Sequence, residues 1–383
     1  MRTPSWHNSF VSNQYSERDG YPSDPANIFL TGGASVGVSL MINMLISSPK
    51  AGILIPIPQY PLYTASLAQH QGIPIPYHLD ESSEWSTSVS DIEVALAEAH
   101  KQGVIAKGLV IINPGNPTGA LLDEATQEKL VDLCEKYSLV LLADEVYQNN
   151  LHRPNTHAFT SFKKVVAKKQ SPIPLVSFHS ISKGVSGECG RRGGYFECTN
   201  FSEDVLALIY KMVSVGLCPP LAGQIGIDSM VRPPLPGQES YELWKKETDT
   251  IHAALASRTQ TMAARLNLLP GVSCVDSPGA LYLYPQITLS KEAQQAAKEA
   301  GKEPDAFYSL ALLAETGICV VPGSGFGQNP NHRIKNDRGH SAIPRAGTVA
   351  RGTCRCPDRH LGAWDFALRN GQRDPSFLRT HRL

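Results

Sequence analysis

The sequence predicts an α/β fold, in which a large doubly wound sheet of mixed, mostly parallel strands is followed by a smaller α+β domain. Short apolar runs alternate with stretches of helical periodicity over residues 24–232. Two of these runs, at residues 109–112 and 139–143, are continuously apolar, as is typical of strands buried in a parallel sheet. A proline cluster at residues 233–236 marks a boundary, so we expect the smaller domain over residues 233–328.

The larger domain is expected to alternate strands and helices in a regular order. Apolar or alternating runs predict strands at residues 28–30, 52–55, 73–78, 109–112, 139–143, 175–178 and 193–197. Apolar residues that recur every three or four positions predict one helix ending near residue 47 and others at residues 89–102, 123–137 and 203–215. Residues 1–23 are polar and weakly patterned, and we treat them as an atypical N-terminal arm.

The smaller domain is expected to contain two helices and three strands. The helices are predicted at residues 239–267 and 305–316, and the strands at residues 271–275, 280–284 and 318–321. Residues 329–383 show no helical or strand period longer than one turn. They predict an atypical, Arg-rich tail that can be disordered.

The overall charge balance argues against nucleic acid and membranes as partners. The chain has 383 residues, of which 42% are hydrophobic, and its 35 Lys and Arg equal its 35 Asp and Glu. No apolar run approaches the roughly 20 residues of a membrane helix. The charges are unevenly distributed, because residues 329–383 carry +7 and the preceding part of the chain carries −7.

The N-terminus and the cysteines indicate a reducing compartment. Residues 1–13 are polar and lack an apolar segment of the kind that secretion signals have, so we expect a cytoplasmic or mitochondrial protein rather than a secreted one. The eight cysteines are scattered, and Cys354 and Cys356 have no second ligand pair nearby. We therefore expect free thiols and no metal site.

One lysine stands out as a candidate for covalent chemistry. Lys183 lies between small residues in Ser-Ile-Ser-Lys-Gly at residues 180–184, directly after a predicted strand. A lysine whose pKa is lowered by burial or nearby cations can form a Schiff base with an aldehyde. Pyridoxal 5′-phosphate (PLP) is the common aldehyde cofactor, and it also requires a phosphate site and an anion for its ring nitrogen.

Other polar residues occupy equivalent places on neighbouring strands. Asn116, Asp144 and Lys183 each follow the end of a predicted strand, and ligands of doubly wound sheets bind beyond these carboxyl ends. The glycine-rich turn at residues 31–35 leads into a helix, where backbone N–H groups suit a phosphate. Taken singly, each has a structural alternative: a turn for Asn116, a helix cap for Asp144, a surface position for Lys183, and an ordinary strand-to-helix connection for the glycines.

The motifs together resemble the PLP-dependent aminotransferases of class I/II, which have fold type I. They are Asn-Pro-Gly-Asn-Pro-Thr-Gly at residues 113–119, Ala-Asp-Glu-Val-Tyr at 143–147, and Ser-Ile-Ser-Lys at 180–183 with Arg-Gly-Gly at 192–194. Longer blocks are most similar to alanine aminotransferase; these are residues 54–63, 142–148, 177–180, 187–190, 217–220 and 315–328. The resemblance extends from about residue 15 to residue 328.

The resemblance implies roles for the residues at the strand ends. Lys183 would join the cofactor aldehyde and afterwards move the proton between the substrate Cα and C4′ of the cofactor. Asp144 would pair with the ring nitrogen. Tyr147 and Asn116 would hydrogen-bond the 3′-oxygen, and Asn116 would also contact the substrate carboxylate.

The resemblance also implies a phosphate site and a stacking residue. The phosphate would be bound by backbone and side-chain groups of Ala34, Ser35, Ser180 and Arg192. Tyr60 would stack on the cofactor ring, with packing in the core as the alternative. Arg191 departs from the family, which usually has an aromatic residue there.

The activity that the resemblance implies is transamination from L-alanine to 2-oxoglutarate, which gives pyruvate and L-glutamate. Its partners would be amino acids and 2-oxo acids, and a homodimer is expected by analogy with the family. Two alternatives remain open. One is another PLP-dependent transaminase that prefers glyoxylate, and the other is a homologue that binds PLP but is inactive.

The inactive alternative arises from a departure at the C-terminal end. In the family, an arginine in a Gly-Thr-x-His-Phe-Arg motif binds the substrate carboxylate. Gly-Thr-Val-Ala-Arg at residues 347–351 resembles it only imperfectly, so Arg351 is either that substrate-binding residue or a solvated arginine. With the atypical N-terminal arm, this indicates an aminotransferase body in which both ends are altered, by divergence or by mis-splicing.

Overall fold

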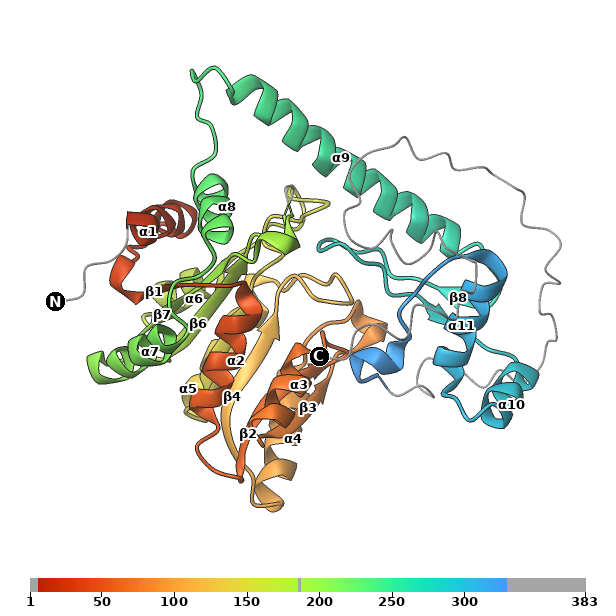
Figure 1. The fold of residues 1–383 in the computed structure, drawn as a ribbon. Helices are drawn as coiled ribbons and strands as arrows, with labels where there is room; N and C mark the ends of the chain where they lie inside the picture. Colours follow the sequence, from red (N-terminus) through yellow and green to blue (C-terminus); the bar gives the residue numbers. More distant parts are fainter. Residues whose placement is uncertain (1–5, 185–186, 329–383) are drawn as a thin grey trace, which may run out of the picture. The chain divides into compact units, whose positions relative to one another are not determined.

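The computed structural model describes residues 6–184 and 187–328 (Figure 1). The predicted tail at residues 329–383, and Arg351 with it, lies outside the described residues. Among those described, no helix combines the length and the apolar character that a membrane span needs.

A seven-stranded sheet forms the centre of the larger part, in the order β1-β7-β6-β5-β4-β2-β3. Only β7 runs antiparallel to its neighbours, and the other strands share one direction. The predicted sheet of mixed, mostly parallel strands is therefore confirmed. Its strands are β1 Ile28–Thr31, β2 Ala51–Ile57, β3 Ile73–His78, β4 Ile105–Ile112, β5 Val140–Asp144, β6 Leu175–Ser180 and β7 Gly194–Thr199.

Helices cover both faces of this sheet, as a doubly wound fold requires (Figure 1). One face packs against α2 Ala34–Leu45, α3 Leu62–Gln69 and α7 Glu203–Val215. The other packs against α4 Val89–Lys101, α5 Glu124–Lys136 and α6 Phe162–Lys169. Side chains alternate between the two faces along a strand. Leu142 therefore packs on the face covered by α2, α3 and α7, and Leu141 packs on the face covered by α4, α5 and α6.

Two helices that the sequence did not predict cover the end of the sheet near β1 and β7. They are α1 Trp6–Asp19 and α8 Leu221–Val231, which contact each other. Val11 and Tyr15 of α1 are one turn apart and fully buried against Tyr195 of β7. Because few other apolar residues accompany them in α1, the helical period was too weak to be read from the sequence.

The part that follows residue 232 is mostly helical, with α9 Tyr241–Leu266, α10 Lys291–Glu299 and α11 Pro304–Thr316. Its strands are short, since β8 covers Val272–Ser273 and pairs with β9 at Gln286–Ile287. The strand predicted at residues 280–284 does not form, because Ala280 has φ +61° and its N–H donates to Asn150 O. The strand predicted at residues 318–321 is also wrong, as this exposed segment pairs with no described strand.

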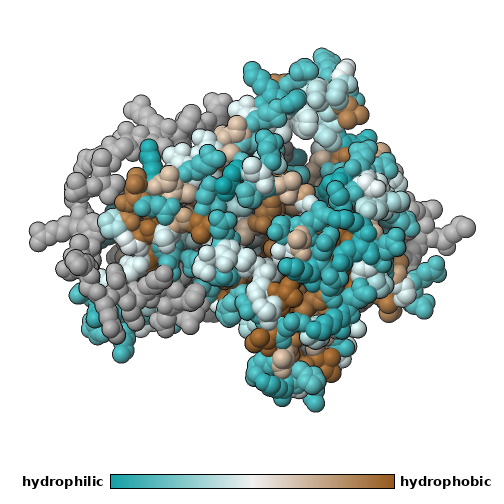
Figure 2. All heavy atoms as spheres, turned by 180° about the vertical axis from the view of Figure 1, so that it is seen from behind, coloured by the Kyte–Doolittle hydropathy of each residue, from teal (hydrophilic) through white to brown (hydrophobic). Residues whose placement is uncertain are grey.

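The surface carries apolar residues among the polar ones (Figure 2). Polar residues cover most of the face shown, and apolar residues gather in smaller groups. Large exposed apolar side chains are frequent in α7, in α8 and in the segment that joins them, among them Val215, Leu217, Leu221 and Ile225. This segment is therefore a candidate contact surface.

Candidate functional site

The carboxyl ends of three adjacent parallel strands bring the predicted ring-binding residues to one edge of the sheet. Ile112, the last residue of β4, is paired with Asp144 of β5, which is paired with Phe178 of β6. Asn116 follows β4 by four residues, and Lys183 follows β6 by three. The sheet register thus accounts for the proximity that the strand-end pattern predicted.

Asp144 is buried and is held by a tyrosine that the sequence analysis did not assign. Its side chain ends β5 with the residue only 6% exposed, and Oδ2 accepts a hydrogen bond of 2.7 Å from Tyr63 Oη. Burial raises the pKa of Asp144, whereas the bond from Tyr63 and the charge of Lys183 oppose that rise. Tyr63 lies in the first turn of α3, three residues after Tyr60. The signal for Tyr63 in the sequence is its place in the block at residues 54–63. Whether Tyr60 or Tyr63 points inward, however, depends on helix α3, which the sequence did not predict.

Tyr147, Asn116 and Lys183 form the next group of contacts. Asn116 Nδ2 donates to Tyr147 Oη at 3.3 Å, and the Lys183 ammonium lies 5.1 Å from the centre of the Tyr147 ring. A second unassigned tyrosine, Tyr282, shares a 2.7 Å hydrogen bond with the Tyr147 hydroxyl. Burial, together with the neighbouring Tyr282, raises the pKa of Tyr147, so its hydroxyl keeps its proton and remains a donor.

The segment that carries Tyr282 is docked against the loops of the sheet edge. Ala280 N–H donates to Asn150 O at 2.9 Å, and Gly279 N–H donates to Gly119 O at 3.1 Å. Asn150 in turn accepts from Gly184 N–H at 2.9 Å through Oδ1, which ties the segment after Lys183 to the same loop. Asn150 was not predicted, because no motif distinguishes it from an ordinary loop asparagine.

The predicted phosphate residues meet at the start of α2. Gly33 is the N-cap of α2 with φ +107°, and a Cβ there would lie 2.3 Å from Arg192 Nη2. The absent side chain leaves room for the guanidinium, which donates to Ser35 Oγ at 3.3 Å. Ala34 packs beside the buried pair Val146 and Tyr147, which links this site to the ring-binding group.

Ser180 and Tyr60 are placed differently. Ser180 is paired with Gly194 across β6 and β7, is buried, and bonds Gly193 O and Ser182 N. Its hydroxyl therefore has backbone partners in this structure rather than a contact with Ser35 or Arg192. Tyr60 is 48% exposed, so packing in the core, the alternative for this residue, is not what it does. Arg191 is exposed.

This arrangement fits PLP in its donor set. The N–H groups at the start of α2, Ser35 Oγ and the Arg192 guanidinium suit a phosphate dianion, and the missing Cβ of Gly33 lets that guanidinium lie against the start of the helix. The buried Asp144 carboxylate suits a protonated ring nitrogen, and Lys183 provides the amine. Within residues 6–184 and 187–328, no group of three or more His, Cys, Asp or Glu is arranged to hold a metal ion.

Comparison with known proteins identifies the family. The family model described as aminotransferase class I and II matches residues 9–340. The chain is 49% identical over 321 residues to a probable mitochondrial alanine aminotransferase of Dictyostelium discoideum, which covers 83% of this chain and 60% of the relative. It is 51% identical over 316 residues to the mitochondrial alanine aminotransferase 2 of Arabidopsis thaliana, covering 82% and 58% of the two chains. The chain thus spans about three fifths of the length of these relatives.

The fold is shared with solved structures. A solved structure of an alanine aminotransferase from Pyrococcus furiosus superposes with a TM-score of 0.70, at 24% identity, and covers 84% of this chain and 74% of that one. This likeness concerns the fold alone, whereas the family match and the identities above cover most of the sequence. The chain belongs to the class I and II aminotransferases, a family of PLP-dependent enzymes of fold type I.

Proposed function

We propose that the protein binds PLP and transfers the amino group of L-alanine to 2-oxoglutarate, which gives pyruvate and L-glutamate. The observation that carries this proposal is the convergence of Lys183, the buried Asp144 and the Asn116–Tyr147 pair at one edge of the sheet. The names of the alanine aminotransferases at about half identity support the choice of substrate. Because the chain spans only part of these relatives, the activity is a proposal about this chain.

Each residue of the site has a task that follows from its chemistry. Bound PLP would supply an aldehyde that an amine can join and a ring that accepts electrons from the substrate Cα. Asp144 would keep the ring nitrogen protonated, because an opposite charge in a buried site favours the charged forms of both groups. The Lys183 amine would take the proton from the substrate Cα and deliver it to C4′ of the cofactor. Tyr147 and Asn116 would donate hydrogen bonds that orient the ring.

The phosphate would anchor the cofactor at the other side of the site. We assign it to the N–H groups of Ala34 and Ser35, the Ser35 hydroxyl and the Arg192 guanidinium, with Ser180 nearby on β6. Tyr60 follows β2 and is half-exposed, so its ring is free to stack on the cofactor. The substrate carboxylate would contact Asn116, and we keep Arg351 as the second candidate for it.

Two alternatives lead to different results in one assay. The name of an Arabidopsis relative that is 48% identical, glutamate–glyoxylate aminotransferase 1, favours glyoxylate as a second acceptor. The imperfect motif around Arg351 favours a protein that binds PLP without turnover. Both kinds of protein would show the visible absorbance band of bound PLP, but the band of the inactive protein would not change when an amino acid is added.

The test is the visible absorbance of purified protein with PLP. We expect a band of lysine-bound cofactor that is absent in Lys183→Ala, and we expect L-alanine to bleach it and 2-oxoglutarate to restore it. Glyoxylate in place of 2-oxoglutarate distinguishes the second acceptor. A band that persists in Lys183→Ala would contradict the assignment of the lysine, and a band that alanine leaves unchanged would favour the inactive homologue.

We also propose that two copies of the chain associate and that the protein acts in mitochondria or the cytoplasm. The exposed apolar residues of α7, α8 and their connection support a second copy as the partner. An open groove lined by Ser35, Val36 and Met212 connects this surface to the phosphate residues, so a partner there would lie beside the site. The names of the two alanine aminotransferases include mitochondrial, which supports that compartment.

A further inference from the structure

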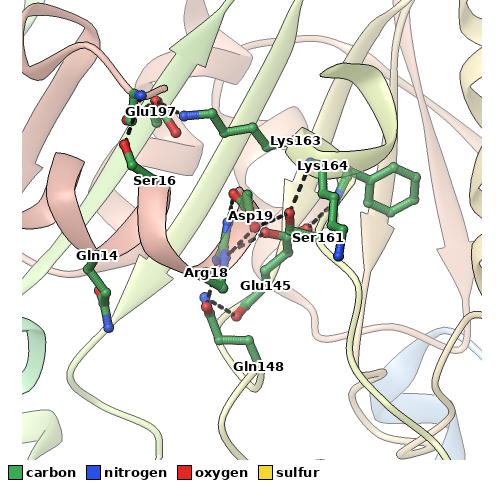
Figure 3. A network of polar contacts seen from close by, with 12 residues as sticks. Gln14, Ser16, Arg18, Asp19, Glu145, Gln148, Ser161, Lys163, Lys164 and Glu197 are labelled. Carbon is green, nitrogen blue, oxygen red and sulfur yellow. Dashed lines mark hydrogen bonds and ion pairs between the residues drawn. The ribbon is translucent and has the colours of Figure 1, made fainter. Parts of the chain in front are cut away.

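A network of buried and half-buried polar side chains joins the end of α1 to the loop after β5 (Figure 3). Arg18 and Asp19 at the end of α1 meet Glu145, Gln148 and Ser161 there. The reaction proposed above uses none of these residues. Their connection to the site is nevertheless direct, because Glu145 is the residue after Asp144 and Gln148 the residue after Tyr147.

Glu145 is completely buried and holds the start of α6. Its Oε1 accepts the N–H of Phe162 at 2.8 Å, and its Oε2 lies 4.0 Å from Arg18 Nη1. Burial raises the pKa of Glu145 to about 7, while the Arg18 charge acts to lower it and the Asp19 and Asp144 charges act to raise it further. A buried carboxylate of this kind needs a cation to keep its charge, and Arg18 is the cation that the network provides.

Arg18 also reaches the other end of the same turn. Its Nη1 donates to Gln148 Oε1 at 2.6 Å, and Gln148 Nε2 donates to Glu145 O at 3.1 Å. Its Nε and Nη2 each donate to Asp19 at 2.7 Å, and Asp19 accepts from Ser161 Oγ at 2.7 Å. The guanidinium is stacked 4.3 Å from the centre of the Tyr15 ring. These contacts fix the guanidinium in one orientation, so it can restrain the turn at residues 145–148.

The turn that Arg18 holds presents the ring-binding residues. Gln148 N–H donates to Glu145 O at 3.1 Å and Asn150 N–H to Tyr147 O at 2.8 Å, which closes the turn around Tyr147. Asp144 and Tyr147 leave this turn towards the cofactor site, whereas Glu145 and Gln148 leave it towards α1. A displacement of Glu145 and Gln148 would therefore also displace Asp144 and Tyr147.

We propose that Arg18 of α1 is a positioning residue for Asp144 and Tyr147, which it holds in their orientation toward the cofactor through Glu145 and Gln148. The inference rests on the proposed function for what Asp144 and Tyr147 bind. It predicts that the N-terminal helix is coupled to the cofactor site although none of its side chains is assigned to that site.

A neutral variant and a matched control separate this role from a merely structural one. Arg18→Met keeps the length of the side chain and removes the cation and its donors. Lys163→Met breaks another buried ion pair on the same side of the sheet, in which Lys163 Nζ lies 2.6 Å from Glu197 Oε1 and both side chains are nearly inaccessible. Lys163 donates to Glu197 and makes no hydrogen bond to residues 144–148. A third variant, Arg18→Lys, tests whether a cation without the guanidinium donors is enough to position these residues.

The first measurement is amide hydrogen exchange over residues 145–150 without PLP. We expect Arg18→Met to speed exchange there about tenfold and Lys163→Met to leave it within about twofold, although both lower the melting temperature. The second is PLP affinity, which we expect Arg18→Met to weaken about tenfold, Arg18→Lys to weaken less, and Lys163→Met to leave unchanged. Both are measured at a temperature at which every variant is folded.

The outcomes decide the inference independently of the proposed function. Equal exchange at residues 145–150 in Arg18→Met and Lys163→Met would overturn it, because Arg18 would then act on stability alone. Unchanged PLP affinity in Arg18→Met would overturn it as well. If the wild-type protein binds no PLP, the proposed function fails, and the exchange measurement still decides whether Arg18 holds the turn.

Discussion

The hydrogen bond from Tyr63 to Asp144 joins two fully packed side chains, and its loss has a defined consequence. In Tyr63→Phe the Asp144 carboxylate would lose its 2.7 Å donor, and its pKa, which burial already raises, would rise further. A carboxyl group that loses its charge more readily and is less restrained pairs less well with a protonated ring nitrogen. We expect turnover to fall roughly 10- to 100-fold and the free energy of unfolding to fall by about 1 kcal/mol. Steady-state kinetics and urea unfolding measure the two effects.

Tyr77 provides the control for this change. It is also fully buried, and its hydroxyl donates to the backbone carbonyl of Val110 at 2.8 Å rather than to a residue of the site. Tyr77→Phe should therefore lose about 1 kcal/mol of stability and keep its turnover. Equal losses of turnover in both variants would show that the bond to Asp144 has no special role.

The polar residues at the strand ends could be predicted from the sequence, and their tyrosine partners could not. Asp144 follows an unmistakable apolar strand, so its place at the sheet edge is a local property. Tyr63 reaches Asp144 across 81 residues of sequence, and Tyr282 reaches Tyr147 across 135. Such pairs depend on how distant segments pack, which no local pattern determines. Arg192 was predicted from the resemblance, because it directly precedes Gly193 and Gly194, and a Cβ at Gly194 would lie 2.5 Å from Ala34 N at the start of α2.

The packing of the segment at residues 277–282 against Gly119 can be tested by comparing Gly119 with Gly103, which has a similar φ. Gly119 has φ +70°, and a Cβ there would lie 1.7 Å from Ser277 Oγ. Gly103 has φ +74° and nothing within 4 Å of its Cβ position. Gly103→Ala should cost about 1 kcal/mol of unfolding free energy from backbone strain alone. Gly119→Ala should cost about 2–4 kcal/mol, because it also displaces the segment that carries Tyr282.

Urea unfolding of the two alanine variants measures this difference, and PLP affinity adds a second readout. We expect weaker PLP binding in Gly119→Ala alone, since its clash is transmitted through Gly279 to the Tyr282–Tyr147 pair. Equal unfolding free energies in the two variants would mean that the contact between residues 119 and 277 contributes nothing.

Elements with a strong local period were predicted well, and elements stabilised by distant partners were not. The helix predicted at residues 203–215 has these bounds in the structure, because its apolar residues repeat regularly. Helix α3 was missed since the prolines before it indicated an extended path and it has only eight residues. Residues 280–284 are a continuous hydrophobic run of the kind that predicts a strand, yet the backbone of residues 279–280 bonds to Gly119 and Asn150, which belong to other loops.

The assembly proposed for the molecule can be tested at the surface of α7 and α8. Leu221 is 71% exposed at the first position of α8, where a glutamate is compatible with the helix and its dipole. If a second copy covers this surface, Leu221→Glu places a charge in an apolar interface, and we expect the dimer to dissociate at least about 100-fold more readily. Sedimentation of the wild type and the variant over a range of concentrations measures this change.

Leu268 separates an interface effect from a general effect of removing surface apolar area. It is 82% exposed after the end of α9, outside the proposed contact surface, so Leu268→Glu should leave the dimer intact. A wild-type protein that is monomeric at micromolar concentration would contradict the assembly, and equal dissociation of the two variants would contradict its location. Because the groove that contains Ser35 and Met212 borders this surface, the monomeric variant should also bind PLP more weakly, which ties the oligomeric state to the site.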